Sequence, residues 1–455
     1  MKRLAFCFDG TWNRLDAPNP TNVVVTAETI LPLAPDGTAQ LVFYDEGVGT
    51  EKNETFRGGI FGSGLVENLA DAYRFLIFNY TPGDQIYIFG FSRGAYTARS
   101  FAGLLNTCGV LLRKHANKVG EAIEHYKQRI TTPQYLEQMR CYRRDHSPEV
   151  CASDEEQTWR QHNLGVANLT LPRLQVTYLG VWDTVGALGI PARYKLLSWV
   201  NEKHEFHDTG LSPFVRSARH AVAIDERRKD FQPALWDNLD ELNVAANSAS
   251  NRADAPYQQV WFPGVHSSVG GGGERRGLSD QSLAWILDGA RAAGLVLDGS
   301  VHSRIFELQP NYREHLDNSE HSSLSYKLMN KFSAADRLPG PKTIHEVSIG
   351  AKRRWLEKAE NLRDGEQYRP ATLNGVAALL DKLNPADYGL GILEEALDPS
   401  KFEMYEVQRG DSLRALAAKR YGKGDEFTRI LKANLDKIDD PNRIYPGQLL
   451  RIPLP

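Results

Sequence analysis

Residues 86–97 of this 455-residue chain read Ile-Tyr-Ile-Phe-Gly-Phe-Ser-Arg-Gly-Ala-Tyr-Thr. An apolar run rich in β-branched and aromatic residues breaks at Gly90-Phe91-Ser92-Arg93-Gly94, and apolar residues at helical spacing follow over 95–105. A G-x-S-x-G sequence between a strand and a helix is the pattern of a nucleophile elbow, in which glycines allow a sharp turn that exposes the serine hydroxyl. The sequence therefore predicts that Ser92 lies at the end of a strand as a candidate nucleophile.

Strand-like and helical patterns alternate along the first part of the chain, which predicts an α/β fold with a mostly parallel sheet covered by helices. We expect strands at 4–8, 40–44, 174–182 and 258–262 and an amphipathic helix at 66–80. The length favours two domains. We expect a catalytic domain at 1–375 with helical insertions at about 111–165 and 191–256, a linker at 376–403, and a small domain at 404–455. The first insertion is interpreted either as a cap over the site or as a solvated helical hairpin.

Composition and charge narrow the possible functions. The net charge of −3 gives no argument for nucleic acid binding. A metal site built from two of the cysteines with His146 and His162 is a weaker alternative to free thiols in a reducing compartment. We therefore expect no metal and no cofactor. The four cysteines are scattered and form no C-x-x-C pair: Cys7, Cys108, Cys141 and Cys151.

The N-terminus does not have the pattern of a secretory signal. Met-Lys-Arg runs directly into the first predicted strand, with no long apolar segment and no cleavage site. No stretch approaches the length needed to span a bilayer. We expect a protein that is made in the cytoplasm and that would need a specialised secretion system to act elsewhere.

A serine nucleophile needs a histidine base and a carboxylate that orients the base. In α/β-hydrolases these residues follow the serine in the order acid, then histidine, each after a strand. The strand at 176–182 ends in Asp183, and the strand at 259–262 ends in a loop that carries His266. Both positions are expected at the edge of the sheet where Ser92 lies. The sequence therefore predicts a catalytic triad of Ser92, Asp183 and His266.

Hydrolysis through this triad also requires two N–H donors for the developing oxyanion. We expect one from the amide of Arg93 and the other from Gly10 or Thr11, after the first strand. The run Phe8-Asp9-Gly10-Thr11 also invites comparison with the D-x-D-G-T motif of haloacid-dehalogenase phosphatases. That interpretation fails because Cys7 occupies the position of the nucleophilic aspartate.

Several ordered blocks resemble an uncharacterised α/β-hydrolase domain family that includes type VI secretion phospholipase effectors. The resemblance extends from residue 4 to about 373 and implies a Ser–Asp–His esterase, with phospholipase A-type activity in characterised members. One departure is Ser268, where the family often has Asp. The matching blocks are Phe8-Asp9-Gly10-Thr11-Trp12-Asn13, Pro20-Thr21-Asn22-Val23, Tyr44-Asp45-Glu46-Gly47-Val48-Gly49-Thr50, the elbow, Gly180-Val181-Trp182-Asp183-Thr184-Val185, Trp261-Phe262-Pro263-Gly264-Val265-His266 and Tyr368-Arg369-Pro370.

The tail, 404–453, resembles a LysM module with β-α-α-β order, which implies binding of N-acetylglucosamine-containing glycans such as peptidoglycan. Some proteins carry this fold in assembly roles instead. The residues proposed for glycan binding come from its recognisable marks: Gly410, Asp411, Ser412, Pro446 and Gly447.

These features favour a serine esterase or lipase that hydrolyses acyl esters of membrane lipids, with an antibacterial type VI secretion effector as the biological role. The resemblance implies a secretion-spike protein and an immunity protein as partners. Two alternatives stay open. The first is a peptidoglycan-binding or secretion-apparatus protein whose hydrolase domain is vestigial. The second is an esterase for small soluble esters.

Overall fold

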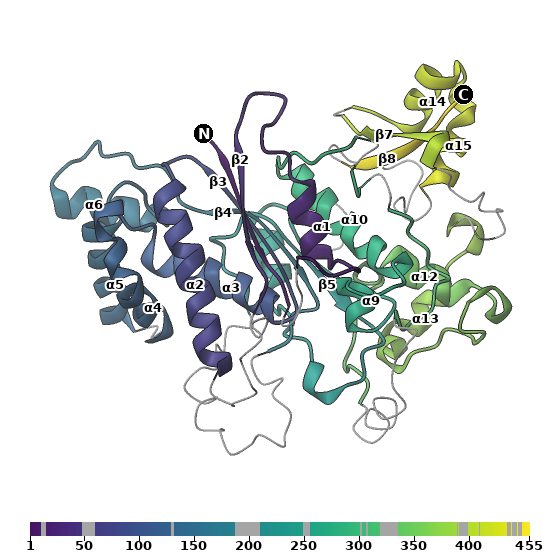
Figure 1. Ribbon diagram of the computed structural model, residues 1–455, viewed down its shortest axis with the longest axis horizontal. Helices are drawn as coiled ribbons and strands as arrows, with labels where there is room; N and C mark the ends of the chain where they lie inside the picture. The colour runs from purple at the N-terminus through teal and green to yellow at the C-terminus, as the bar shows by residue number, and fades with distance from the viewer. Residues whose placement is uncertain are drawn as a thin grey trace.

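The computed structural model places a six-stranded, fully parallel sheet at the centre of the molecule, in the order β2-β1-β3-β4-β5-β6 (Figure 1). These strands are β1 (Arg3–Phe8), β2 (Gln40–Asp45), β3 (Gln85–Phe91), β4 (Val176–Trp182), β5 (Ala218–Ala223) and β6 (Tyr257–Phe262). The structure describes residues 1–10, 15–47, 60–128, 132–186, 210–248, 255–300, 303–305, 308–318, 335–388, 390, 399–408, 410–434, 438, 444 and 448–455.

Helices cover both faces of this sheet. The helices of the domain are α1 (Asn22–Thr29), α2 (Ile60–Asn79), α3 (Arg93–Cys108), α4 (Val119–Gln128), α5 (Pro133–His146), α6 (Asp154–Leu164), α8 (Leu239–Ala245), α9 (His266–Gly270), α10 (Gly277–Ala292), α12 (Ile349–Leu356) and α13 (Ala377–Leu380). Helices α2 and α3 pack on one face, and α1 and α10 on the other. Short 3-10 turns are η1 (Arg113–Lys118), η3 (Lys229–Phe231), η4 (Ile344–Glu346), η5 (Ala359–Asn361), η6 (Ala371–Val376), η7 (Pro385–Tyr388) and η8 (Pro399–Lys401).

The alternation of side chains along β1 divides the core into two layers, because successive residues of a strand point to opposite faces. Leu4, Phe6 and Phe8 pack with α2 and α3 on one face. Ala5 and Cys7 pack with α1 and α10 on the other. Both faces of the strand are buried, as expected for a parallel sheet. The predicted α/β-hydrolase-like fold is confirmed.

The predicted helical insertion at 191–256 is wrong in part, because it contains the strand β5. Ala218–Ala223 is a core strand between β4 and β6, not part of a helical insertion. Its sequence, Ala-Arg-His-Ala-Val-Ala, has one β-branched residue and no apolar alternation. The strand is recognisable only by its hydrogen-bonded neighbours, because tertiary context overrides its weak propensity. Within the predicted first insertion the structure has the helices η1, α4, α5 and α6.

The C-terminal module has the predicted β-α-α-β order. Strands β7 (Phe402–Glu406) and β8 (Leu449–Pro453) pair antiparallel, and α14 (Leu413–Tyr421) and α15 (Phe427–Ala433) pack on them, with η9 (Gly424–Glu426) between the helices. The module contacts α10, because Arg291 Nη1 lies 3.0 Å from Glu406 Oε2 and the Leu449 amide donates to Asp288 Oδ1 at 3.2 Å. Among the described residues, no helix is long and apolar enough to cross a membrane.

Candidate active site

The elbow at Ser92 has the strained geometry that the glycines predict. Ser92 has φ 58° and ψ −121°, a conformation that residues with a side chain rarely adopt. Its amide donates to Trp182 O at 3.0 Å, which ties the turn to the end of β4. A Cβ at Gly90 would lie 2.5 Å from Gly94 O, and one at Gly94 would lie 2.2 Å from Phe8 O. Only glycine fits at these two positions, so the turn can close and direct the serine oxygen toward His266 at the start of α3.

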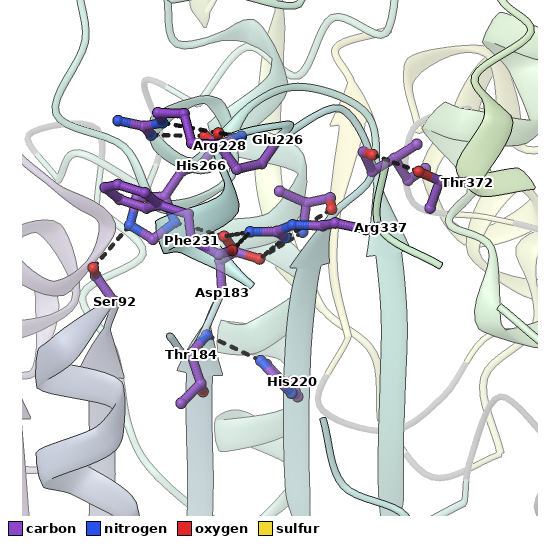
Figure 2. Close-up of polar contacts among 12 residues, drawn as sticks. Ser92, Asp183, Thr184, His220, Glu226, Arg228, Phe231, His266, Arg337 and Thr372 are labelled. Carbon is purple, nitrogen blue, oxygen red and sulfur yellow. Dashed lines mark hydrogen bonds and ion pairs between the residues drawn. The ribbon is translucent and has the colours of Figure 1, made fainter. Parts of the chain in front are cut away.

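The three residues of the predicted triad meet at the carboxyl edge of the sheet (Figure 2). Ser92 Oγ lies 2.8 Å from His266 Nε2, and His266 Nδ1 lies 2.5 Å from Asp183 Oδ2. Ser92 follows β3, Asp183 follows β4, and His266 begins α9 just after β6. With Nδ1–H donating to the carboxylate, Nε2 can accept the serine proton. The arrangement is chemically able to activate Ser92 as a nucleophile.

The base is shielded from water. His266 is 6% exposed, and the rings of Phe91 and Phe231 lie with centroids 4.7 Å and 4.9 Å from its imidazole. Burial lowers the pKa of His266, against the opposing effect of Asp183, so the neutral base is the form favoured near neutral pH. Burial would raise the pKa of Asp183, but the charge of Arg337 and the hydrogen bond from His266 outweigh it and hold that pKa well below its usual range.

Two acidic residues after β5 hold the loop that carries His266. The Gly264 amide donates to Asp225 Oδ2 at 2.7 Å, and Tyr368 Oη donates to the same oxygen at 2.9 Å. The His266 amide donates to Glu226 Oε2 at 3.3 Å. Burial raises the pKa of Asp225 to about 6, while the partners of Glu226 lower its pKa. These contacts fix the position of the base rather than reacting themselves.

His220 supports the acid of the triad in the same way. It is fully buried on β5, and its Nε2 accepts the amide of Thr184 at 3.2 Å while Nδ1 lies 3.0 Å from Gln259 Oε1. Burial lowers the pKa of His220 to about 3, so this imidazole stays neutral and keeps one acceptor nitrogen. It therefore fixes the turn directly after Asp183.

Arg337 is the main site residue that sequence reasoning missed. Its guanidinium donates from Nη1 to Asp183 Oδ1 at 2.5 Å and from Nη2 to Asp183 Oδ2 at 2.9 Å. It lies 154 positions after its partner, outside any motif, so no sequence signal pointed to it. Asp225 and Glu226 were missed for a different reason. They follow β5, and recognising that strand would have placed two carboxylates at the catalytic edge.

The structure supports the three predicted oxyanion donors to different degrees. Arg93 is the first residue of α3 and directly follows Ser92, where the leading N–H groups of a helix lack intrahelical acceptors. The Gly10 amide instead donates to Asp9 Oδ1 at 2.6 Å, which occupies the N–H that the prediction required. Thr11 lies outside the described residues. The structure therefore disfavours Gly10 in this role, and Arg93 and Thr11 stay predictions.

Asp9 is buried and ties together the segment after β1. Besides Gly10, it accepts a hydrogen bond from Thr21 Oγ1 at 2.6 Å and another from Tyr44 Oη at 3.0 Å. These contacts anchor the loop beside the elbow to α1 and β2. Burial raises the pKa of the neighbouring Cys7 thiol well above its usual value, so Cys7 is not an alternative nucleophile.

The structure also describes Ser268 and the cysteines that the sequence singled out. Ser268, where the resemblance led us to expect Asp, is buried, and its hydroxyl donates to Leu316 O at 2.7 Å. Among the described residues, no group of three or more His, Cys, Asp or Glu side chains gathers as metal ligands would. All four cysteines are free thiols.

Three of the five residues proposed for glycan binding shape a turn in the C-terminal module. Gly410 has φ 92°, and Asp411 Oδ2 accepts the Gln408 amide at 2.7 Å and Tyr405 Oη at 2.8 Å. Ser412 caps α14, because its side chain accepts the amide of Ala415. Pro446 and Gly447 lie outside the described residues. Glycan binding by these five residues stays a prediction.

The fold and the site together define an α/β-hydrolase-like protein with a Ser–His–Asp arrangement. A family model for the catalytic domain of Tle1-like phospholipase effectors of type VI secretion matches residues 2–289, which is more than half of the chain. The chain therefore belongs to the Tle1-like effector family. A LysM family model matches residues 405–453, so the C-terminal module is a LysM domain.

Two curated relatives match parts of the chain. The uncharacterized protein YEL023C of Saccharomyces cerevisiae is 26% identical over 248 residues, which cover 51% of this chain and 32% of that protein. The potassium binding protein Kbp of Escherichia coli is 41% identical over 51 residues, which cover 11% of this chain and 34% of that protein. The chain thus spans about a third of the length of each relative.

Two solved structures are similar over longer stretches. The Tle1 effector bound to the VgrG spike is 18% identical with a TM-score of 0.31, and the match covers 60% of this chain and 51% of that one. An uncharacterized protein from Pseudomonas aeruginosa is 15% identical with a TM-score of 0.36, covering 98% of this chain and 75% of that one. At these identities and scores, neither likeness bears on the activity of this chain.

Proposed function

We propose that this protein is a serine hydrolase that cleaves acyl esters of membrane phospholipids, with Ser92 as nucleophile, His266 as base and Asp183 as the orienting acid. The observation that carries the proposal is the continuous hydrogen-bonded chain from Ser92 Oγ through His266 to Asp183. Membership of the Tle1-like phospholipase effector family supports a lipid substrate.

The chemistry follows from the positions of these atoms. His266 Nε2 takes the proton of Ser92 Oγ as the oxygen attacks the ester carbonyl carbon, and the carbonyl oxygen becomes an oxyanion. The Arg93 amide is the proposed first donor to that oxyanion. When the tetrahedral intermediate collapses, the alcohol leaves with the proton from His266 and the acyl group stays on Ser92. Water activated by the same histidine then releases the fatty acid and restores the serine.

Release of fatty acid from phospholipid vesicles tests this proposal. Wild-type protein is expected to release fatty acid, and Ser92→Ala is expected to abolish the release. Ser100→Ala is the matched control, because Ser100 is a buried serine of the same helix α3 outside the triad. Release that survives in Ser92→Ala would refute the mechanism. Strong activity on short soluble esters with none on vesicles would instead favour the small-ester alternative.

The LysM domain supports a second, separable function. We propose that it binds N-acetylglucosamine-containing glycans such as peptidoglycan and so localises the enzyme near the cell wall. Full-length protein should then sediment with purified peptidoglycan, and N-acetylglucosamine oligomers should compete. A chain ending at residue 398 should stay in the supernatant. Equal sedimentation of both chains would contradict glycan binding by this domain.

Family membership also supports a delivery route. We propose that the protein is made in the cytoplasm and exported by a type VI secretion system, with a spike protein as carrier and an immunity protein protecting the producer. Secretion of the protein that persists when the apparatus is disabled would contradict this route. If glycan sedimentation were strong while no ester was cleaved at any pH, a binding protein with a vestigial hydrolase domain would be the better account.

A further inference from the structure

Arg337 makes a buried, two-point contact with the acid of the triad. The side chain of Arg337 is 1% exposed and that of Asp183 is fully buried. Both terminal nitrogens reach the carboxylate, Nη1 to Oδ1 at 2.5 Å and Nη2 to Oδ2 at 2.9 Å. Nη1 also donates to Ala223 O at 2.9 Å and Nη2 donates to Phe231 O. The guanidinium is thus held by Asp183 directly after β4, by the end of β5 and by η3, and Figure 2 shows it beside Asp183.

This contact changes the charge that His266 experiences. In a serine triad, the aspartate charge stabilises the imidazolium that forms when the histidine takes a proton. Here a fully buried cation neutralises that charge at hydrogen-bonding distance from the same carboxylate. The imidazolium therefore gains less from Asp183 than it would from an unpaired carboxylate.

The second carboxylate beside His266, that of Glu226, is also paired with a guanidinium group. The carboxylate of Glu226 accepts the His266 amide, and its own partner is Arg228, whose Nη2 lies 2.7 Å from Oε2. The other described groups in contact with the ring are uncharged, namely the hydroxyl of Ser92 and the rings of Phe91 and Phe231. Two carboxylates and two guanidinium groups thus lie near His266 among the described residues, so their formal charges sum to zero, while Asp183 and Glu226 still raise the pKa of His266 and Arg228 lowers it.

We propose, on the basis of the triad mechanism above, that Arg337 is a positioning residue that lowers the proton affinity of His266 by balancing Asp183 and so keeps the base neutral and the hydrolase active in mildly acidic conditions. The fork of the guanidinium has a second effect. It fixes the plane of the carboxylate, so that Oδ2 stays aligned with His266 Nδ1. Charge and geometry are therefore separable, because lysine keeps the first and loses the second.

Nuclear magnetic resonance titration of ¹³C-labelled histidine tests the proposal without any turnover, with the His266 signal assigned from His266→Gln. Arg337→Met is expected to raise the pKa of His266 by about 1 or more, the size expected for removing a nearby charge. Arg337→Lys is expected to leave the His266 titration close to wild type. The control is Arg160→Met, which removes an equally buried arginine paired with Glu156 in α6, and it should not move the signal.

Ester hydrolysis adds a kinetic readout. The acidic limb of kcat/KM should move upward with the titration in Arg337→Met. If the pKa of His266 rises by about 1, kcat/KM of Arg337→Met should be about tenfold below that of wild type at a pH lower than the acidic limbs of both proteins. Arg337→Lys should lower kcat while leaving that limb in place. A merely structural role for Arg337 would lower the amount of active enzyme without moving the limb.

An unchanged His266 titration in folded Arg337→Met would overturn the proposal. If that variant does not fold, Arg337→Gln decides, because glutamine keeps a hydrogen-bond donor for Asp183 and loses the charge: a raised pKa of His266 supports the proposal, and an unchanged pKa overturns it. Absence of hydrolysis by wild-type protein at every pH would refute the proposed function, while the titration would still decide the role of Arg337.

Discussion

Replacing Gly94 by alanine tests how the elbow is held against the end of β1. The new Cβ would lie 2.2 Å from Phe8 O and 2.4 Å from Asp9 O, whereas real Cβ atoms essentially never approach other atoms within 3.0 Å. The elbow and β1 must therefore separate by about 0.8 Å. Strand β1 cannot easily yield, because it is hydrogen-bonded to β2 on one side and β3 on the other.

The expected cost has two parts. Overpacking of this kind costs about 1–3 kcal/mol of the free energy of unfolding. A displacement approaching 1 Å at the nucleophile lowers the rate by about 100-fold, because attack geometry is lost. Urea unfolding and kcat/KM on a short-chain ester measure the two effects separately.

Gly120→Ala is the matched control for this substitution. Gly120 lies in α4, and a Cβ there would meet nothing within 4 Å. Alanine should therefore stabilise the protein, by up to about 1 kcal/mol from helix propensity, and leave kcat/KM unchanged. A Gly94→Ala protein with wild-type stability and wild-type rate would refute the contact between the elbow and β1.

Three further predictions concern the buried charges and the module contact. The unfolded chain releases the Asp225 proton near pH 3.8 and the folded protein near about 6, so wild-type stability falls as pH rises through this window, by about 3 kcal/mol. Asp225→Asn should therefore be the more stable protein in urea at pH 7 and no more stable at pH 4, and an equal difference at both pH values would contradict this. Asp183→Asn should lower kcat/KM by about 10⁴-fold, because it changes the tautomer of His266 and leaves Arg337 without its carboxylate. A loss under tenfold would argue against Asp183 as the orienting acid. A chain ending at residue 398 lacks Glu406 and Leu449 and should melt at a lower temperature by calorimetry, and an unchanged melting temperature would show that the contact with α10 contributes nothing.

The sequence was sufficient to predict that Ser92, Asp183 and His266 meet, because each follows a strand with a clear apolar pattern. Parallel strands bring their carboxyl ends to one edge, so residues 92, 183 and 266 could be brought together from the order of the strands alone. The strand β5 escaped this reasoning because alanines, an arginine and a histidine fill it. Its burial depends on the neighbouring strands and on helix α10, which no local window of sequence contains.

Arg337 and Gly10 show two other limits of prediction from sequence. Arg337 reaches Asp183 from a distant segment, and an isolated arginine carries no positional signal in sequence. Gly10 was a reasonable oxyanion donor because glycines follow early strands in such folds. The direction of its N–H depends on the side chain of Asp9, which a motif does not specify.

The central claim is that Ser92 is the nucleophile of phospholipid hydrolysis, and covalent labelling tests it most directly. A serine-directed fluorophosphonate should modify the Ser92 peptide, identified by mass spectrometry, and the labelled fraction should equal the fraction of fatty-acid release that is lost. His266→Gln should slow the labelling, because the base no longer takes the serine proton. A label on another residue, or undiminished release from fully labelled protein, would contradict the account.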